Sequence, residues 1–373
     1  MATAAQAGIK APDSAQGVLE AIEGYFNNGW TDGLPVVPAT KGAVDAMLAA
    51  AGRNPTEELG EVAPRMGIAT VESVAVNAVL AGCKPEYFPV VLAAVEAILE
   101  PTFNLNGVQA TTNPCAPLVI VSGAIVKELG FNWGYNCFGQ GNRANATVGR
   151  ALRLVMSNIG GGHPGTGDKS TLGQPAKYTF CVAESPDSPW EPLHVERGLS
   201  AQESGVTVFA CTYHVGSFGG GGDEENKEAA LKILQSTAEA VIGIAGEFAV
   251  SFGGQLGLVF NPYNAEVLAK NGWTKQGIKQ YLYEKARVPM SVVHKRLAEA
   301  PGGTLGSRGV DEERWPQWLN GADDAMLFPL IRKPENYIII CCGDVYRAWS
   351  ALLAGWGYMG GYAHSRPIRK RQR

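Results

Sequence analysis

The sequence predicts an α/β fold built from two related halves behind an N-terminal arm. Apolar runs of strand length alternate along the chain with helix-length segments, which is typical of α/β layering around buried sheets. The 373 residues are enough for two domains, and a hydrophobic content of 46% can fill their cores. Five residues also recur at a single offset of 159 residues, beginning with Pro175 and Tyr178, which match Pro334 and Tyr337, and this indicates an internal repeat.

Residues 1–59 are predicted to form the arm. A helix over Ala15–Asn27 is stopped by Asn28 and Gly29. The segment 30–38 that follows is too rich in proline for a central strand. A second, short helix is expected over Gly42–Ala51.

Residues 60–198 and 205–373 are predicted to be the two halves, each with a helix, a buried strand and a second helix in that order. An insertion near residues 300–330 is expected in the second half, which ends in a basic tail. In the first half the elements are Phe88–Leu99, Leu118–Val121 and Gly123–Leu129, and in the second half Ala229–Ile244, Leu256–Phe260 and Ala265–Lys270.

The repeated phrase supports a duplication. Pro175 to Tyr178 (PAKY) and Pro334 to Tyr337 (PENY) each lead into a strand, and Trp190 and Trp349 follow at the same distance. Two such halves are expected to pack about a pseudo-twofold axis, with a ligand pocket at their junction. The alternative is two unrelated α/β segments whose strands begin alike.

Composition limits the classes of partner. The net charge of −4 and the pI of 5.8 show no electrostatic footprint for nucleic acid, and the basic run Arg366–Arg373 is interpreted as a solvated tail. No stretch approaches the about 20 apolar residues of a membrane helix, and the N-terminus lacks the pattern of a secretory signal. Seven scattered cysteines indicate reduced thiols and a soluble, cytoplasmic protein.

A charged fraction of only 18%, together with 47 glycines, suggests that another subunit covers part of the surface. A homo-oligomer or a hetero-oligomer is therefore expected.

The polar, glycine-rich stretch 132–147 opens directly into a helix expected over Ala146–Asn158. Bare amides at such a helix start favour an anion, and an arginine adds a charge-assisted fork. The alternative is a helix capped by an asparagine, with glycines that serve only close packing. The stretch has neither the GxxxxGK[ST] nor the GxGxxG spacing, which disfavours nucleotides. The candidate ligands of a small anionic substrate are Asn136, Asn142, Arg143 and Asn145.

The long loop after this helix carries His163 and Asp168, which are candidates for proton transfer and substrate binding. An ordinary surface loop explains the same residues.

Four other residues are candidates for catalysis. Cys115 lies between two prolines and Cys137 lies in the glycine-rich stretch, so either could be a nucleophilic or redox thiol. His194 and His214 are each expected at the end of a strand, where a general base could act. Buried structural roles are the alternative for all four. The five histidines show no metal-ligand spacing, so no metal site is predicted, and the cofactor stays open.

Five phrases of the chain are notable: Asp32–Pro35 (DGLP), Ala81–Phe88 (AGCKPEYF), Arg143–Arg153 (RANATVGRALR), Ser188–Trp190 (SPW) and Asn271–Lys275 (NGWTK). Together they resemble the larger region of the bacterial UGSC-motif (seleno)protein family. The resemblance spans most of residues 30–360 and implies thiol or selenol chemistry. The family's U/C-G-S-C motif is absent here, so a small two-cysteine subunit or other groups of this chain would have to supply the nucleophile.

The leading hypothesis is the substrate-binding and catalytic subunit of a thiol-dependent enzyme that acts on a small anionic or carbonyl compound. A hydrolase or lyase without redox chemistry is the second, and it would remain active without any cysteine. A non-catalytic scaffold subunit is the third.

Overall fold

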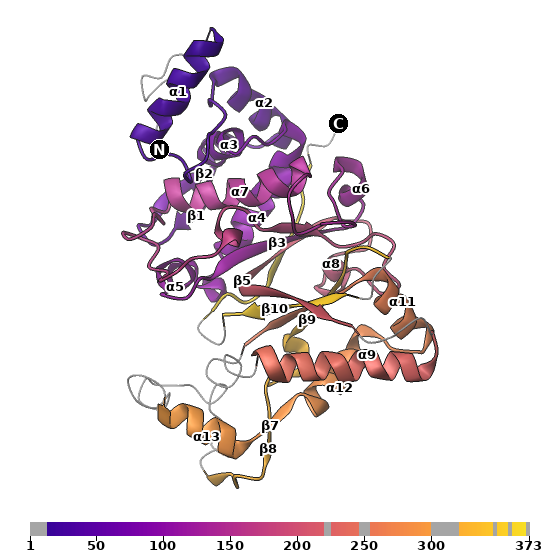
Figure 1. Ribbon diagram of the computed structural model, residues 1–373. Coiled ribbons are helices and arrows are strands. Elements are labelled where there is room, and N and C mark those ends of the chain that lie inside the picture. Colours follow the sequence, from indigo (N-terminus) through magenta and orange to yellow (C-terminus); the bar gives the residue numbers. More distant parts are fainter. Residues whose placement is uncertain are drawn as a thin grey trace. The chain divides into compact units, whose positions relative to one another are not determined.

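The computed structural model describes residues 13–219, 225–245, 254–299, 321–345, 349–356 and 360–370. The chain forms two compact units, both of which combine helices with strands (Figure 1). The predicted α/β class is confirmed. Unit 1 consists of the described parts of Met1–Pro186, Pro192–Ala210 and Ala363–Arg373, and unit 2 of the described parts of Asp187–Glu191 and Cys211–Tyr362.

The strands of unit 1 pair in the order β4-β3-β5. Every residue of β3 (Ala116–Ser122) is buried, and β3 runs parallel to β4 (Cys181–Ala183). β11 (His364–Pro367) pairs antiparallel with the first part of β5 (Gly205–Phe218), which continues into unit 2 after Ala210. The predicted basic tail therefore begins in a strand.

The helices of unit 1 include two that are apolar nearly all round, α3 and α4, and both are almost entirely buried. A small hairpin, β1–β2, precedes α3. The predicted helix over Ala15–Asn27 is confirmed at both ends. The elements are α1 (Ala15–Asn27), α2 (Lys41–Ala51), β1 (Glu58–Val62), β2 (Gly67–Thr70), α3 (Val71–Leu80), α4 (Phe88–Ile98), α5 (Leu105–Ala110), α6 (Ile125–Leu129), α7 (Arg143–Asn158) and α8 (Leu193–Glu196).

Helix α7 positions the site described below. Asn142 caps its start by accepting a hydrogen bond from the Asn145 amide over 3.0 Å, so the helix begins three residues earlier than predicted. The helix packs on α3 and α4 and is followed by Gly160. A Cβ atom on Gly160 would lie 2.5 Å from the carbonyl oxygen of Ala63, so a larger residue has no room there. This close approach directs the chain into the loop 161–174.

Unit 2 contains the strand order β9-β6-β10, with β10 next to the second part of β5. β6 and β9 are parallel, and β10 is antiparallel to β6. Apolar residues of its helices and strands form one buried cluster. The elements are α9 (Lys227–Ala240), a π-helical turn (Val241–Ala245), β6 (Leu256–Phe260), α11 (Pro262–Lys270), α12 (Lys275–Lys285), β7 (Arg287–Pro289), α13 (Met290–Glu299), β8 (Leu327–Pro329), β9 (Tyr337–Cys341) and β10 (Ser350–Gly355).

The internal duplication stays a prediction. Both repeated phrases form a short 3-10 turn ahead of a strand, at Pro175–Lys177 and at Pro334–Asn336. The tryptophans that follow differ, because Trp190 is 9% exposed and Trp349 is 62% exposed. Most of the insertion predicted near residues 300–330 lies outside the described residues.

Within the described ranges, no single helix has the length and apolar character needed to cross a membrane, and one bent pair, Pro85–Ile98 with Pro101–Ala110, meets both criteria together.

Candidate active site

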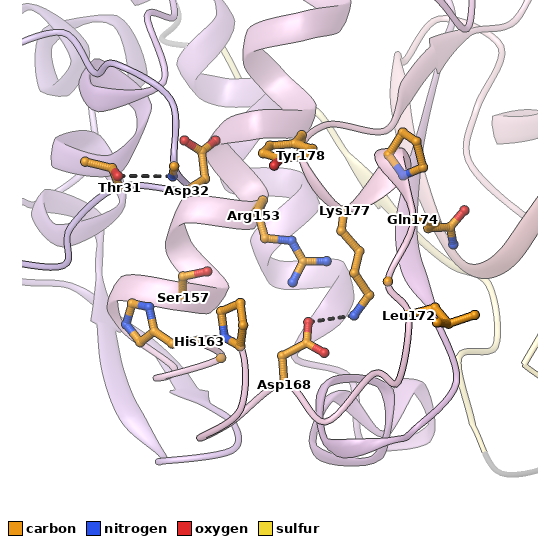
Figure 2. A pocket seen from close by; sticks show the side chains of 15 residues that line it. Thr31, Asp32, Arg153, Ser157, His163, Asp168, Leu172, Gln174, Lys177 and Tyr178 are labelled. Atoms are coloured by element: carbon orange, nitrogen blue, oxygen red, sulfur yellow. Dashed lines mark hydrogen bonds and ion pairs between the residues drawn. The ribbon is translucent and has the colours of Figure 1, made fainter. Parts of the chain in front are cut away.

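A cavity of about 710 Å³ lies within unit 1. Its walls come from three segments that are distant in sequence: the arm loop at Thr31–Gly33, the second half of α7, and the chain from Gly162 to Tyr178 (Figure 2). The cavity is lined by both polar and apolar groups, including Leu172 and Tyr178 at 93% and 49% exposure. A space of this size suits a small organic molecule.

Arg153 is the least expected residue in this cavity. It is 8% exposed, and among the described residues its guanidinium has no hydrogen-bond or ion-pair partner. Burial lowers the pKa of this guanidinium, and the negative charge of Asp168 works in the opposite direction. An arginine keeps its charge in proteins even so. The cavity therefore holds a buried positive charge whose hydrogen-bond donors are unused.

Ser157, one helical turn beyond Arg153, adds a second unused polar group. It is 6% exposed, and its hydroxyl makes no hydrogen bond within the described chain. Neither side chain is among those with fully buried, unpartnered polar atoms in the described chain, so both groups open onto the cavity, where a ligand can supply their partners.

Lys177 and Asp168 form an ion pair across the cavity floor. The Lys177 Nζ lies 2.6 Å from Asp168 Oδ2, and the two side chains are 14% and 9% exposed. Asp168 Oδ1 accepts the amide of Ser170 over 3.0 Å, which fixes the carboxylate. Burial is the main cause that lowers the pKa of the Lys177 amine, and the charge of Arg153 lowers it further, whereas the bond to Asp168 raises it.

His163 lines the same cavity. Its carbonyl oxygen accepts the amides of Thr166, Gly167 and Asp168, which closes the loop tightly and leaves the imidazole on the cavity side. The ring makes no hydrogen bond in the described structure. Burial lowers the pKa of this imidazole, and the nearby positive charge of Arg65 lowers it further, which favours the neutral ring.

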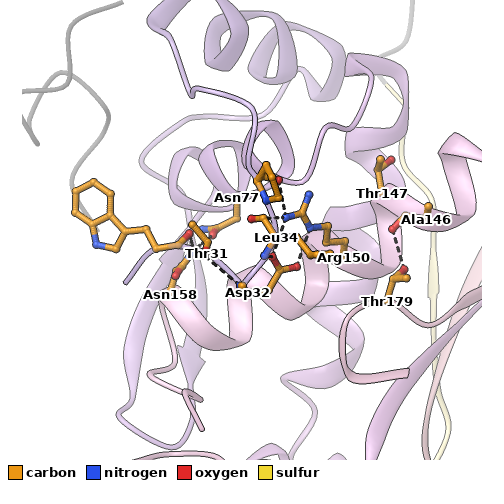
Figure 3. Close-up of polar contacts among 12 residues, drawn as sticks. Thr31, Asp32, Leu34, Asn77, Ala146, Thr147, Arg150, Asn158 and Thr179 are labelled. Atoms are coloured by element: carbon orange, nitrogen blue, oxygen red, sulfur yellow. Dashed lines mark hydrogen bonds and ion pairs between the residues drawn. The ribbon is translucent and has the colours of Figure 1, made fainter. Parts of the chain in front are cut away.

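The arm loop is held on α7 by a buried pair (Figure 3). Arg150 Nε and Nη2 each donate to Asp32 over 2.7 Å, and the Asp32 side chain is only 4% exposed. Asn158 donates to the carbonyl of Trp30, which precedes this loop, over 3.3 Å. Because these contacts hold the loop to the helix, one wall of the cavity is fixed before any ligand binds.

The polar groups of the predicted anion loop have partners within the protein. Arg143 donates from Nε and Nη2 to the carbonyl of Gly82 over 3.0 and 2.9 Å. Asn142 caps α7, and the buried Asn145 exchanges two hydrogen bonds with the backbone of Asn132. None of these residues lines the cavity, so their role as anion ligands stays a prediction.

Asn136 also lies outside the cavity. Its backbone has a φ of 55°, and its side-chain amide donates to the carbonyl of Gln140 over 2.9 Å. Among the predicted substrate-binding residues, Asp168 is the one that lines the cavity.

The seven cysteines all lie in described parts of the chain, where they are buried and form no disulfide bond. Cys115 is 1% exposed and does not line the cavity, but it interacts electrostatically with both Arg153 and Lys177. Cys137 is 6% exposed, although its place in the glycine-rich stretch suggests an accessible thiol. A thiol role for either residue stays a prediction.

The two predicted histidine bases lie elsewhere. His194 is in the short helix α8 and not at the end of a strand, and its Nδ1 is 3.1 Å from the Ser122 hydroxyl. The strand assignment there was wrong because Pro192 begins a helical turn instead. His214 lies inside β5, opposite Leu353, and burial lowers the pKa of its imidazole. Neither residue lines the cavity.

Sequence reasoning missed Arg153 and Lys177. A usable signal was present for the first, because Arg153 interrupts the apolar run Ala151–Met156 of α7. Lys177 is part of the repeated phrase and was interpreted only as a sign of duplication. The described chain contains no group of three or more histidine, cysteine, aspartate or glutamate side chains placed to bind a metal ion.

Comparison of this chain with protein-family models, with curated proteins and with solved structures finds no match.

Proposed function

We propose that unit 1 is the substrate-binding part of an enzyme that acts on a small anionic compound in the cavity at Arg153. The observation that carries the proposal is the buried guanidinium of Arg153, which has no hydrogen-bond or ion-pair partner among the described residues. A buried charge is costly unless it is paired, so a native site that keeps one is expected to receive the opposite charge from a ligand.

The charges around the cavity favour a single negative charge on the ligand. Asp168 pairs with Lys177 at 2.6 Å and Asp32 with Arg150 at 2.7 Å, so with Arg153 these groups carry one net positive charge, although both carboxylates also attract Arg153. A carboxylate matches this arrangement, since a guanidinium donates to both of its oxygens at once.

Phosphate fits less well. Phosphate sites use free backbone amides, and three glycines of the cavity wall donate theirs within the protein. The acceptors are the Thr31 hydroxyl for Gly33, the Met156 carbonyl for Gly162, and the Ser170 hydroxyl for Gly173.

The reactive groups in the cavity support chemistry without a redox step. Lys177, Asp168 and His163 all line it, and the first two form an ion pair over 2.6 Å. Such groups take and return protons during the cleavage of a bond next to a carbonyl group. A lyase or hydrolase acting on a small carbonyl acid is therefore the activity we propose.

The thiol-dependent enzyme is the second candidate. The electrostatic interaction of Cys115 with Arg153 and Lys177 favours it, since neighbouring positive charges activate a thiol. The Cys115→Ser variant separates the two candidates: activity that survives this change excludes Cys115 thiol chemistry. The two-cysteine partner subunit and the UGSC relationship belong to this second candidate.

Anion binding is testable by calorimetry with a panel of small carboxylates and inorganic phosphate. We expect Arg153→Met to weaken carboxylate binding by about a hundredfold or more, because a buried charge pair is lost. Arg143→Ala is the matched control, since Arg143 lies on the same helix and outside the cavity. Equal loss in the two variants, or tighter binding of phosphate than of every carboxylate, would contradict the proposal.

A further inference from the structure

We propose that Lys177 is a nucleophile that condenses with the carbonyl group of an oxo acid, which is then held on the chain as a Schiff base. This inference rests on the proposed anion site at Arg153 and adds the class of substrate and the covalent step. It starts from the positions of Lys177, Arg153 and Asp168 around one cavity.

The amine and the guanidinium approach the cavity from different elements. Lys177 extends from the 3-10 turn ahead of β4, and Arg153 extends from α7 (Figure 2). A carboxylate held on the guanidinium places the rest of a small ligand against the amine. Such positioning turns the attack on a carbonyl carbon into a reaction within one complex.

Lys177 also has what a lysine nucleophile requires. It must lose a proton before it attacks, and Asp168 lies 2.6 Å from its Nζ as the acceptor. Burial and the charge of Arg153 lower the pKa of the amine, which increases its neutral fraction. The side chain is 14% exposed, so water has limited access to the amine.

The step balances without an oxidant or reductant. The Lys177 nitrogen forms a bond to the carbonyl carbon, and the carbonyl oxygen becomes a hydroxyl by taking a proton that the ammonium group released. The nitrogen lone pair then forms the C=N bond while the C–O bond breaks, and the hydroxyl leaves as water with a second proton. The ammonium group and the carbonyl compound thus yield an iminium ion and water. His163 and Ser157, whose side chains face the cavity, are placed to pass these protons.

The loop 161–174, which carries Asp168, also contains a control lysine. Lys169 is exposed, does not line the cavity, and contacts the carbonyl of Gly165 with its amine. If labelling reflected only the ordinary reactivity of a lysine amine, the exposed Lys169 would be labelled at least as readily as Lys177.

The test is trapping with sodium borohydride in the presence of pyruvate, followed by peptide mass spectrometry of the full chain. Hydride reduces the iminium ion to a stable secondary amine, so the labelled peptide gains the mass of the probe less one oxygen atom. We expect the label on Lys177, none on Lys169, and complete loss in Lys177→Arg, which keeps the positive charge beside Asp168. Acetone, which lacks the carboxylate, is expected to label far less, and Arg153→Met is expected to remove this difference between the two probes.

Each outcome decides one claim. Suppose that pyruvate binds in calorimetry, that its binding depends on Arg153, and that Lys177 carries no label. This result overturns the Schiff base, while the proposed anion site stands. Equal labelling of Lys177 and Lys169 also overturns it. Absence of any carboxylate binding overturns the proposed function itself. A thermal melt of Lys177→Arg, with Lys177→Gln as a second variant, verifies that loss of label does not reflect unfolding.

Discussion

The two units place the tyrosine of similar phrases, PAKY in unit 1 and PENY in unit 2, in different surroundings. In unit 1 the turn Pro175–Lys177 leads to Tyr178, which is 49% exposed at the cavity. In unit 2 the turn Pro334–Asn336 leads to Tyr337, which is fully buried in the apolar cluster. The turn is therefore a generic way to enter a strand. The chemistry that we propose for unit 1 depends on what surrounds the turn, namely α7 and the loop that follows it.

The largest expected difference in stability between the two units comes from their ion pairs. In unit 1 the side chains of Asp32 and Arg150 are 4% and 15% exposed, whereas in unit 2 those of Glu225 and Lys270 are 49% and 50% exposed. We expect Asp32→Ala to lower the free energy of unfolding by about 3–5 kcal/mol, because it leaves a buried arginine charge without its partner. Glu225→Ala is expected to change it by about 0–1 kcal/mol. Urea unfolding of both variants measures this, and similar losses would contradict the distinction between the pairs.

The next largest expected change in the free energy of unfolding comes from the two tyrosines that follow the turns. The Tyr337 hydroxyl is buried with no hydrogen-bond partner in the described structure, and burial raises the pKa of this phenol. Removing an unsatisfied buried hydroxyl is favourable, so Tyr337→Phe is expected to raise the free energy of unfolding by about 1 kcal/mol. Tyr178→Phe removes an exposed group and is the matched control, expected to leave stability unchanged. A loss of stability in Tyr337→Phe would mean that its hydroxyl has a partner.

The smallest expected effect on stability comes from the histidines, through their pH dependence. Burial lowers the pKa of both His163 and His214 below 6.5, and Arg65 contributes only for His163. The unfolded chain therefore takes up a proton first as the pH falls below 7, and each histidine reduces stability in that range. We expect His163→Gln to lose less stability than the unchanged protein between pH 7 and pH 5.

Arg65→Ala separates the two histidines further. In an NMR titration it is expected to raise the pKa of His163 toward 6.5 and leave that of His214 unchanged. A parallel shift of both would contradict the assignment of Arg65 to His163.

Much of the fold could be predicted from the sequence. The strand Leu256–Phe260 is confirmed at both ends, and the helix predicted over Phe88–Leu99 ends one residue earlier, at Ile98. These segments have strong apolar patterns bounded by clear stop signals. α8 escaped prediction because a helix of four residues has too little periodicity to recognise.

The candidate site was harder to predict for a different physical reason. Periodicity shows that Arg153 lies on a mostly apolar part of α7, but not whether a cavity or a packed neighbour faces it. The neighbours that answer this question, Asp32 and Lys177, are brought there by tertiary structure. The predicted loop around Arg143 had the right chemistry for an anion, yet its donors are used by Gly82 and the local backbone.

Because the cysteines are buried, the rate at which their thiols are alkylated measures local opening of the protein. A thiol reacts with an alkylating reagent only when it is exposed and ionised, and burial raises the pKa of Cys83 to about 12. Modification of the native protein should thus be slow and should record transient opening events. Because Cys83, Cys115, Cys137 and Cys181 belong to unit 1 while Cys211, Cys341 and Cys342 belong to unit 2, peptide-resolved alkylation would time the two units separately.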